Sequence, residues 1–162
     1  RFEGKPLVDI SGIPMIRRVY DRACMAKSLD TVVVLTDNER ISSYCSKHEI
    51  RCIVIEDDCK TGTDRCAKAL KLLDGDVFVN VQGDMPDIAP NMIVKILEVL
   101  GNYKVATIFT DMPEEKQKDP NTVKLITNGK EAHWFCRASL DYGVHHLGVY
   151  GYKKEMAILS QI

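Results

Sequence analysis

Short apolar runs alternate with stretches of helical spacing between Pro14 and Thr110, and this alternation constrains the fold more than any other feature. The predicted strands are Thr31–Thr36, Cys52–Ile55, Val77–Val81 and Val105–Thr110. The predicted helices are Pro14–Ala26, a pattern through Ile41, Tyr44 and Cys45, Asp64–Leu73 and Asn91–Leu100. Strands separated by helices are typical of βαβ units, whose right-handed crossovers make a parallel sheet with helices on both faces. The sequence therefore predicts an α/β, Rossmann-like fold with a mostly parallel sheet flanked by helices.

The pattern changes after Thr110, where polar residues 111–116 interrupt it. Three shorter strand-like segments follow, at Val123–Thr127, His133–Arg137 and Leu147–Tyr152. Asn128-Gly129, between the first two, is a strong β-hairpin signal. This part of the chain therefore predicts a small antiparallel excursion, and the pattern at Lys153–Ile162 predicts a final helix.

Composition limits the classes of function. The 162 residues are 45% hydrophobic and 28% charged, with no repeat or low-complexity linker, which predicts a single domain over residues 1–162. A net charge of −1 provides no basic field of the kind that nucleic-acid-binding proteins use. No apolar segment approaches the roughly 20 residues that cross a bilayer. We therefore expect neither a nucleic-acid partner nor membrane insertion, while a small phosphorylated ligand stays possible.

The six cysteines form no C-x-x-C pair, which argues against a zinc site. Free, buried thiols in a reducing cytoplasm explain them best, and the sequence identifies no neighbour that would activate one as a nucleophile.

The strand Val77–Val81 runs into Gln82-Gly83-Asp84. Ligands of open α/β sheets bind at the carboxyl ends of strands, and Asp84 offers the hard oxygen that Mg²⁺ prefers. Gly83 has no Cβ, so a ligand can approach its backbone closely. The alternative is an ordinary turn in which Asp84 only caps the next segment.

Two further segments could bind phosphates. Arg1 and Lys5 flank Gly4 and could cradle phosphate oxygens, although for this motif taken alone a solvated terminus is the simpler explanation. Residues 61–65 open a helix, whose free N–H groups favour anions, but Thr61 and Asp64 also resemble a capping box that needs no ligand.

Two polar side chains near predicted strand ends could line a cleft. Arg137 would emerge from the end of one strand, and His146 directly precedes another. Either could instead be an ordinary surface or hydrogen-bonded residue. Glycines 148 and 151, inside the second of these strands, suggest a bulge or a close approach of the backbone.

Several of these segments, with others named next, follow one another along the chain in the same order as the motifs of a known family. They are Arg1–Leu7 with Gly12–Ile16, Thr36–Ile41, Thr61–Arg65, Val79–Asp84, Pro120–Lys124, Phe135–Ala138 and His146–Tyr152. The set closely resembles the 3-deoxy-manno-octulosonate cytidylyltransferase (CMP-Kdo synthetase) family of sugar nucleotidyltransferases. Against that family, the sequence is expected to be incomplete at both ends and to lack a loop after Tyr142.

The resemblance implies a nucleotide-diphospho-sugar transferase fold and a nucleotidyltransferase activity. The reaction would move a cytidylyl group from CTP to the anomeric hydroxyl of 3-deoxy-D-manno-octulosonate (Kdo), giving CMP-Kdo and pyrophosphate. It further implies a Mg²⁺ cofactor, a cytoplasmic homodimer and a role in the biosynthesis of lipopolysaccharide or a related polymer.

The resemblance also assigns roles to individual residues. The catalytic residues would be Lys5 and Asp84, with Asp84 as the metal ligand. The nucleotide-binding residues would be Arg1, Lys5, Thr61, Gly62, Thr63, Arg65 and Gln82. The sugar-binding residues would be Gln82, Arg137, His146 and Tyr150.

Two alternatives stay open at this point. A related cytidylyltransferase could act on another acidic sugar, 8-amino-Kdo or a sialic acid. A catalytically silent nucleotide-binding module could keep the fold without the chemistry, and Met85, where the family usually has Glu, is the residue that favours it.

Overall fold

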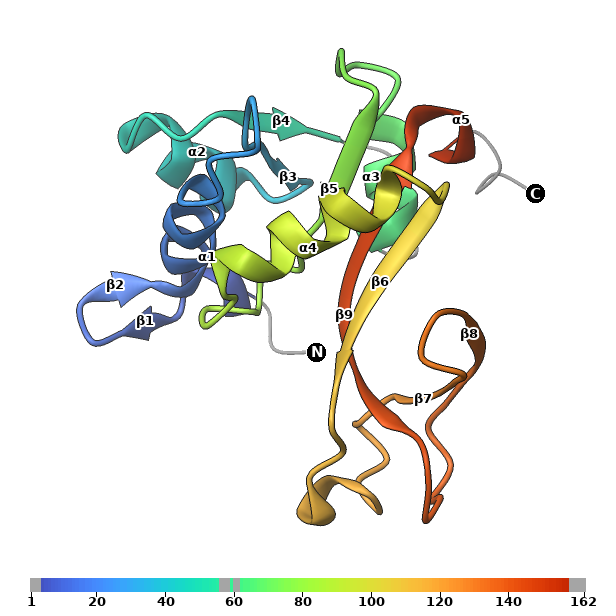
Figure 1. Ribbon diagram of the computed structural model, residues 1–162. Coiled ribbons are helices and arrows are strands. Elements are labelled where there is room, and N and C mark those ends of the chain that lie inside the picture. The colour runs from blue at the N-terminus through green and yellow to red at the C-terminus, as the bar shows by residue number, and fades with distance from the viewer. Residues whose placement is uncertain (1–3, 56–58, 60–61, 158–162) are drawn as a thin grey trace. The chain divides into compact units, whose positions relative to one another are not determined.

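Residues 4–55, 59 and 62–157 are described by a computed structural model, drawn in Figure 1. The chain divides into two compact units, one formed by Arg1–Ala106 with Tyr150–Ile162 and the other by Thr107–Val149. Within the described residues, no helix is long and apolar enough to cross a membrane.

The first unit contains most of the helices. Its elements in chain order are η1 (Lys5–Leu7), β1 (Asp9–Ile10), β2 (Ile13–Pro14), α1 (Met15–Cys24), β3 (Val34–Thr36), α2 (Glu39–Lys47), β4 (Cys52–Val54), α3 (Gly62–Ala69), β5 (Val77–Asn80), α4 (Pro90–Leu100) and α5 (Lys154–Ala157). Two long strands, β6 (Val105–Thr110) and β9 (Val144–Lys153), begin in one unit and end in the other. The predicted alternation of strands and helices is confirmed, whereas the short β1–β2 hairpin was not predicted.

Helices α1 and α2 form where the sequence places apolar residues on one helical face. Ile16, Val19 and Ala23 are the buried residues of α1, at the spacing of a single stripe. Helix α2 starts after Asn38, whose Oδ1 accepts a hydrogen bond from the backbone N–H of Arg40 at 2.9 Å. That bond satisfies one of the N–H groups that a helix start leaves without a partner.

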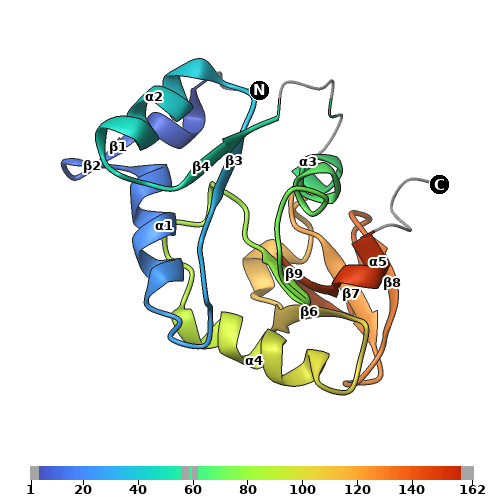
Figure 2. The same ribbon diagram turned by 90° about the horizontal axis from the view of Figure 1, so that it is seen from above.

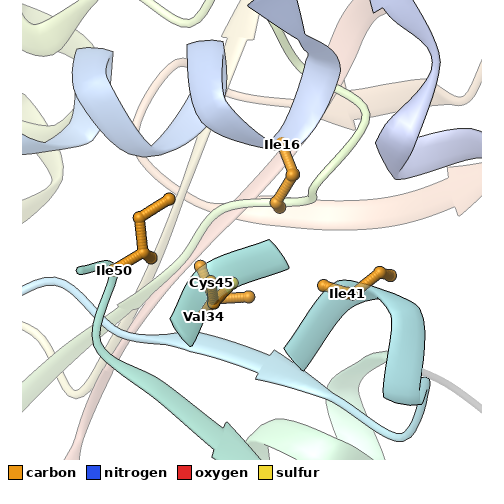
Figure 3. Packing of buried hydrophobic residues seen from close by; sticks show 5 residues of the cluster. All are labelled: Ile16, Val34, Ile41, Cys45 and Ile50. Carbon is orange, nitrogen blue, oxygen red and sulfur yellow. The ribbon is translucent and has the colours of Figure 1, made fainter. Parts of the chain in front are cut away.

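A buried apolar cluster joins these helices to the parallel strand pair β3–β4. Its members are Ile16, Val34, Ile41, Cys45 and Ile50, shown together in Figure 3. Figure 2 shows α1 and α2 lying beside β3 and β4, so one face of this pair is covered by helices, as expected for an α/β fold.

The cysteines differ in burial more than the sequence suggested. All six are free thiols, but Cys45 is buried, Cys24 is exposed and the other four are intermediate. Burial raises the pKa of Cys45 to about 12, and burial likewise raises the pKa of Cys66 to about 11. The expectation of buried free thiols is therefore confirmed for Cys45 and wrong for the exposed Cys24, and the other four thiols are only partly buried.

We expect iodoacetamide at neutral pH to alkylate Cys24 first and to leave Cys45 unmodified while the protein stays folded. The thiolate is the reactive species, and Cys45 combines burial with a raised pKa. Peptide mass mapping after short exposures checks this order. Denaturing the protein first is the control and should remove the difference, whereas equally fast labelling of Cys45 in the folded protein would contradict its burial.

The direction of strand pairing departs from the prediction. Strands β3 and β4 are parallel, but β5 pairs antiparallel with β9, from Val77 beside Lys153 to Asn80 beside Tyr150. The β7–β8 and β7–β9 pairs are also antiparallel. Two neighbouring parallel strands need a crossover connection between them, usually a helix. Strand β9 follows the antiparallel segment β7–β8 and not a helix, so the alternation of helices and strands did not determine the direction of β9. For the described residues, the prediction of a mostly parallel sheet is corrected to an α/β fold whose larger sheet contains these antiparallel pairs.

Helix α4 packs against β9 at a glycine. A Cβ built on Gly151 would lie 2.3 Å from Ile96 Cγ2 and 2.6 Å from Leu100 Cδ1, both on α4. Ile96 and Leu100 are each only 1% exposed. The predicted close approach of the backbone at this glycine is therefore confirmed.

The second unit is built around a hairpin. It contains η2 (Glu114–Lys116), β7 (Lys124–Thr127) and β8 (Ala132–Cys136), with the adjoining parts of β6 and β9. Asn128 Oδ1 accepts hydrogen bonds from the backbone N–H groups of Lys130 and Glu131, at 3.0 and 2.8 Å. Gly129 has φ +92°, the left-handed conformation that such a turn needs. The predicted hairpin and antiparallel excursion are confirmed.

The last described element, α5, covers Lys154–Ala157 and lies within the final helix that was predicted over Lys153–Ile162. Lys153 instead ends β9, and residues 158–162 of the predicted helix lie outside the described residues.

Candidate functional site

Two predicted site residues that are distant in the sequence meet in the first unit. Lys5 Nζ donates a hydrogen bond to Asp84 Oδ2 at 2.7 Å, across 79 positions of sequence. Lys5 lies on η1, and Asp84 lies in the turn after β5, which is closed by a bond from the N–H of Met85 to the carbonyl of Gln82. The structure thus brings a cation from near the start of the chain to the carboxylate at the end of β5.

The Lys5–Asp84 pair is accessible to a ligand. The two side chains are 51% and 41% exposed. An exposed ion pair contributes only about 0–1 kcal/mol to stability, so exchanging it for ligand contacts costs little. Lys5 could then bind an anionic oxygen while Asp84 binds a cation.

The residues around Asp84 fit one kind of metal site. Within residues 4–55, 59 and 62–157, no group of three or more His, Cys, Asp and Glu side chains is arranged to hold a metal ion. Mg²⁺, however, is commonly bound by one or two carboxylates together with substrate phosphates and water. A single exposed carboxylate next to a lysine therefore fits Mg²⁺ that arrives with a polyphosphate, and does not fit an all-protein cage.

A second cation in the first unit is Arg65 on α3. Its Nη2 donates to Oδ2 of Asp37, the residue that follows β3. The Arg65 side chain is 19% exposed, and its Nε is buried with no hydrogen-bond partner in the described part of the chain. A buried N–H without an acceptor costs about 1–3 kcal/mol, so a ligand oxygen at this guanidinium would be favoured.

Asp37 was missed by the sequence reasoning, although it follows a predicted strand in the same way as Asp84 does. The other predicted nucleotide contacts are less fully described. Gly62 and Thr63 are the first two residues of α3, whereas Arg1 and Thr61 lie outside the described residues. Their predicted roles therefore stay predictions.

Gln82 and Tyr150 also belong to the first unit. Gln82 is exposed and lies two residues beyond the end of β5. Tyr150 on β9 pairs with Asn80 of β5, and its ring lies 6.2 Å from that of Tyr152, nearly parallel to it. Burial raises the pKa of the Tyr150 hydroxyl, so at neutral pH it is a neutral donor and acceptor.

Arg137, in the second unit, is held by the loop before β7. Its Nη1 donates to the carbonyl oxygens of Asn121 and Pro120, at 2.7 and 3.5 Å. The loop itself is organised by Asp119, whose carboxylate accepts bonds from the backbone N–H of Asn121 and the hydroxyl of Thr122, at 2.8 and 3.0 Å. These bonds lower the pKa of Asp119, so its carboxylate stays ionised in the folded protein.

Lys124 supports the same loop from inside the unit. Its side chain is fully buried, and Nζ donates to the carbonyl oxygens of Asp119 and Thr122, at 2.7 and 3.2 Å. Sequence reasoning assigned no role to Lys124 individually, although it closes the Pro120–Lys124 motif. A lysine inside a strand pattern does not by itself reveal that it is buried.

His146 is the most enclosed of the predicted sugar contacts, with 6% of its surface exposed. Its Nε2 lies 2.8 Å from Thr107 Oγ1, and the ring of Phe135 approaches it edge-on with centroids 4.9 Å apart. Burial, and then the neighbouring charge of His145, lower the pKa of His146. The imidazole is therefore neutral at neutral pH.

Comparison with known proteins shows which family the chain belongs to. The family model described as "Cytidylyltransferase" matches residues 1–161. The chain is 42% identical over 148 residues to the mitochondrial 3-deoxy-manno-octulosonate cytidylyltransferase of Arabidopsis thaliana, covering 88% of this chain and 51% of the relative. It is 37% identical over 171 residues to the 8-amino-3,8-dideoxy-manno-octulosonate cytidylyltransferase of Shewanella frigidimarina, covering 95% of this chain and 70% of that protein.

A solved structure is similar over almost the whole chain. It is that of a CMP:2-keto-3-deoxy-manno-octonic acid synthetase complexed with CTP, with a TM-score of 0.89 and 30% identity. The match covers 97% of this chain and 70% of the synthetase. The chain thus spans about half the length of the plant relative and somewhat more than two thirds of the bacterial relative and of the solved structure. On these matches, and as its motifs predicted, the chain belongs to the cytidylyltransferase family.

Proposed function

We propose that this protein transfers the cytidylyl group of CTP to the anomeric hydroxyl of Kdo, giving CMP-Kdo and pyrophosphate. The observation that carries the proposal is the exposed Lys5–Asp84 pair, 2.7 Å apart, in a chain of the cytidylyltransferase family. The names of the plant and bacterial relatives, which act on octulosonate sugars, support the class of acceptor.

In this proposal Lys5 binds phosphate oxygens of CTP, and Asp84 would hold Mg²⁺. When bound, Mg²⁺ would neutralise charge on the triphosphate and on the departing pyrophosphate. The oxygen of the sugar hydroxyl forms a bond to the α-phosphorus and its proton passes to solvent, while the bond from that phosphorus to the pyrophosphate oxygen breaks and pyrophosphate leaves. No protein nucleophile takes part, so the chain contributes mainly positioning and charge neutralisation.

The remaining nucleotide contacts are assigned to residues around α3 and β5. Arg65, with its buried and unsatisfied Nε, would donate to an oxygen of the nucleotide. The N–H groups at the start of α3, at Gly62 and Thr63, would favour an anion or the polar edge of the base. Gln82 would serve nucleotide or sugar, while Arg1 and Thr61 keep nucleotide roles on the resemblance alone.

The sugar contacts are assigned by charge and hydrogen-bonding capacity. Arg137 would bind the sugar carboxylate, because a guanidinium has five N–H donors and its contacts with the loop carbonyls use only Nη1. His146 and Tyr150, both neutral at neutral pH, would contact sugar hydroxyls.

We further propose that both compact units belong to one nucleotidyltransferase domain, supported by the family match over residues 1–161. The homodimer, the cytoplasmic location and a role in lipopolysaccharide biosynthesis stay predictions of the family resemblance.

Pyrophosphate release measured with a panel of acceptors tests the proposal. The protein is assayed with CTP and Mg²⁺ and with Kdo, 8-amino-Kdo or a sialic acid in turn, and we expect the highest kcat/KM with Kdo. Faster release with 8-amino-Kdo would favour the activity named for the Shewanella relative. No release with any acceptor by a folded protein would contradict the proposal and favour the silent binding module.

A further inference from the structure

The hydroxyl of Thr107 on β6 lies between two polar atoms of the second unit. Its Oγ1 donates to the carbonyl oxygen of Val149 at 2.7 Å and lies 2.8 Å from Nε2 of His146. A carbonyl oxygen can only accept, and a threonine hydroxyl has a single proton. That proton is used toward Val149, so Oγ1 must accept the hydrogen bond from the imidazole. Nε2 of His146 therefore carries a hydrogen.

The surroundings of His146 hold its ring in this orientation. The backbone N–H of His146 donates to the carbonyl of Val123 at 3.1 Å, and the Phe135 ring lies edge-on against the imidazole. Turning the ring over would place a carbon in front of Thr107 Oγ1 and lose the hydrogen bond. The orientation is therefore determined by Thr107 as well as by packing.

The charge state of the His146 ring determines what its second nitrogen can do. Burial and the neighbouring His145 lower the pKa of His146, so the ring is neutral near pH 7. A neutral imidazole has one N–H, and with the hydrogen on Nε2 the other nitrogen, Nδ1, is an acceptor.

We propose that Thr107 is a positioning residue that fixes His146 in the Nε2–H tautomer and in one ring orientation. Its consequence for catalysis rests on the proposed function. If His146 contacts the sugar, it does so as an acceptor through Nδ1, which suits a hydroxyl donor and not a carboxylate. Recognition of the carboxylate then falls to a cation such as Arg137.

The test compares Thr107→Val, which keeps the side-chain shape and removes the hydroxyl, with Thr107→Ser, which keeps the hydroxyl. Long-range ¹H–¹⁵N NMR of the imidazole identifies which nitrogen carries the hydrogen, without any turnover. We expect His146 to be the Nε2–H tautomer in the unmodified protein and in Thr107→Ser. In Thr107→Val we expect a mixture of tautomers or a shift toward Nδ1–H.

Kinetics supply the second readout. We expect Thr107→Val to raise KM for Kdo about fivefold to tenfold, as for one lost hydrogen bond, with KM for CTP unchanged and Thr107→Ser close to the unmodified protein. An Nδ1–H tautomer in the unmodified protein would overturn the proposal, as would ring signals that do not change in folded Thr107→Val. Because the NMR readout needs no substrate, failure of the proposed function and failure of this inference are distinguishable.

Discussion

Replacing Asp84 with asparagine will lower kcat/KM for CTP- and Kdo-dependent pyrophosphate release by about 10²- to 10³-fold. Asparagine keeps the size of the side chain but removes the charge that pairs with Lys5 and that would hold Mg²⁺. Raising the Mg²⁺ concentration should recover part of the lost rate, because a neutral amide oxygen is a weaker ligand than a carboxylate. Initial rates over a Mg²⁺ titration measure both effects.

The matched control is Asp87→Asn, which removes an exposed carboxylate in the same turn region. We expect this variant to keep nearly full activity. Thermal melting of Asp84→Asn should stay close to that of the unmodified protein, because an exposed pair contributes only about 0–1 kcal/mol. Equal losses of activity in the two variants, or an unchanged rate in Asp84→Asn, would contradict the role given to Asp84.

Replacing Gly151 with alanine will lower the free energy of unfolding by about 3 kcal/mol, the upper end of the usual cost of overpacking a core. The new Cβ would lie 2.3 Å from Ile96 Cγ2 and 2.6 Å from Leu100 Cδ1. Since both side chains are almost completely buried, they have little room to move away. Helix α4 would have to shift from β9, and urea unfolding measures the cost.

Gly129→Ala is the comparison variant for Gly151→Ala. A Cβ at Gly129 would meet nothing within 4 Å, so its cost comes only from φ +92° and should be about 1 kcal/mol. Similar destabilisation of the two variants would show that the contact between α4 and β9 is looser than described.

Much of the fold could be predicted because its signals are local. The helical stripe of α1 and the Asn128-Gly129 turn each depend on residues close together in the sequence. The antiparallel pairing of β5 with β9 could not be predicted in this way. It joins residues 70 to 76 positions apart, and the pattern of Leu147–Tyr152 shows that a strand forms but not its direction.

The residues of the candidate site were likewise predicted only in part from the sequence. Lys5 and Asp84 were predicted because each belongs to a motif with its own chemistry, and the structure brings them together. Asp37 and Thr107 were not predicted, because each contacts a partner that lies far away in the sequence. Lys124 was not predicted because a lysine in a strand pattern gives no sign that it is buried, although its partners Asp119 and Thr122 are close in the sequence. Thr107 is 39 positions from His146, and a threonine in a strand carries no sign of such a contact.

The measurement that tests cytidylyl transfer most directly is a ³¹P NMR time course of the protein with CTP, Mg²⁺ and Kdo. We predict that the triphosphate resonances of CTP decrease while a phosphodiester resonance of CMP-Kdo and a pyrophosphate resonance grow in equal amounts, and only when Kdo is present. Unchanged CTP, or release of phosphate without any phosphodiester product, would contradict the proposed reaction.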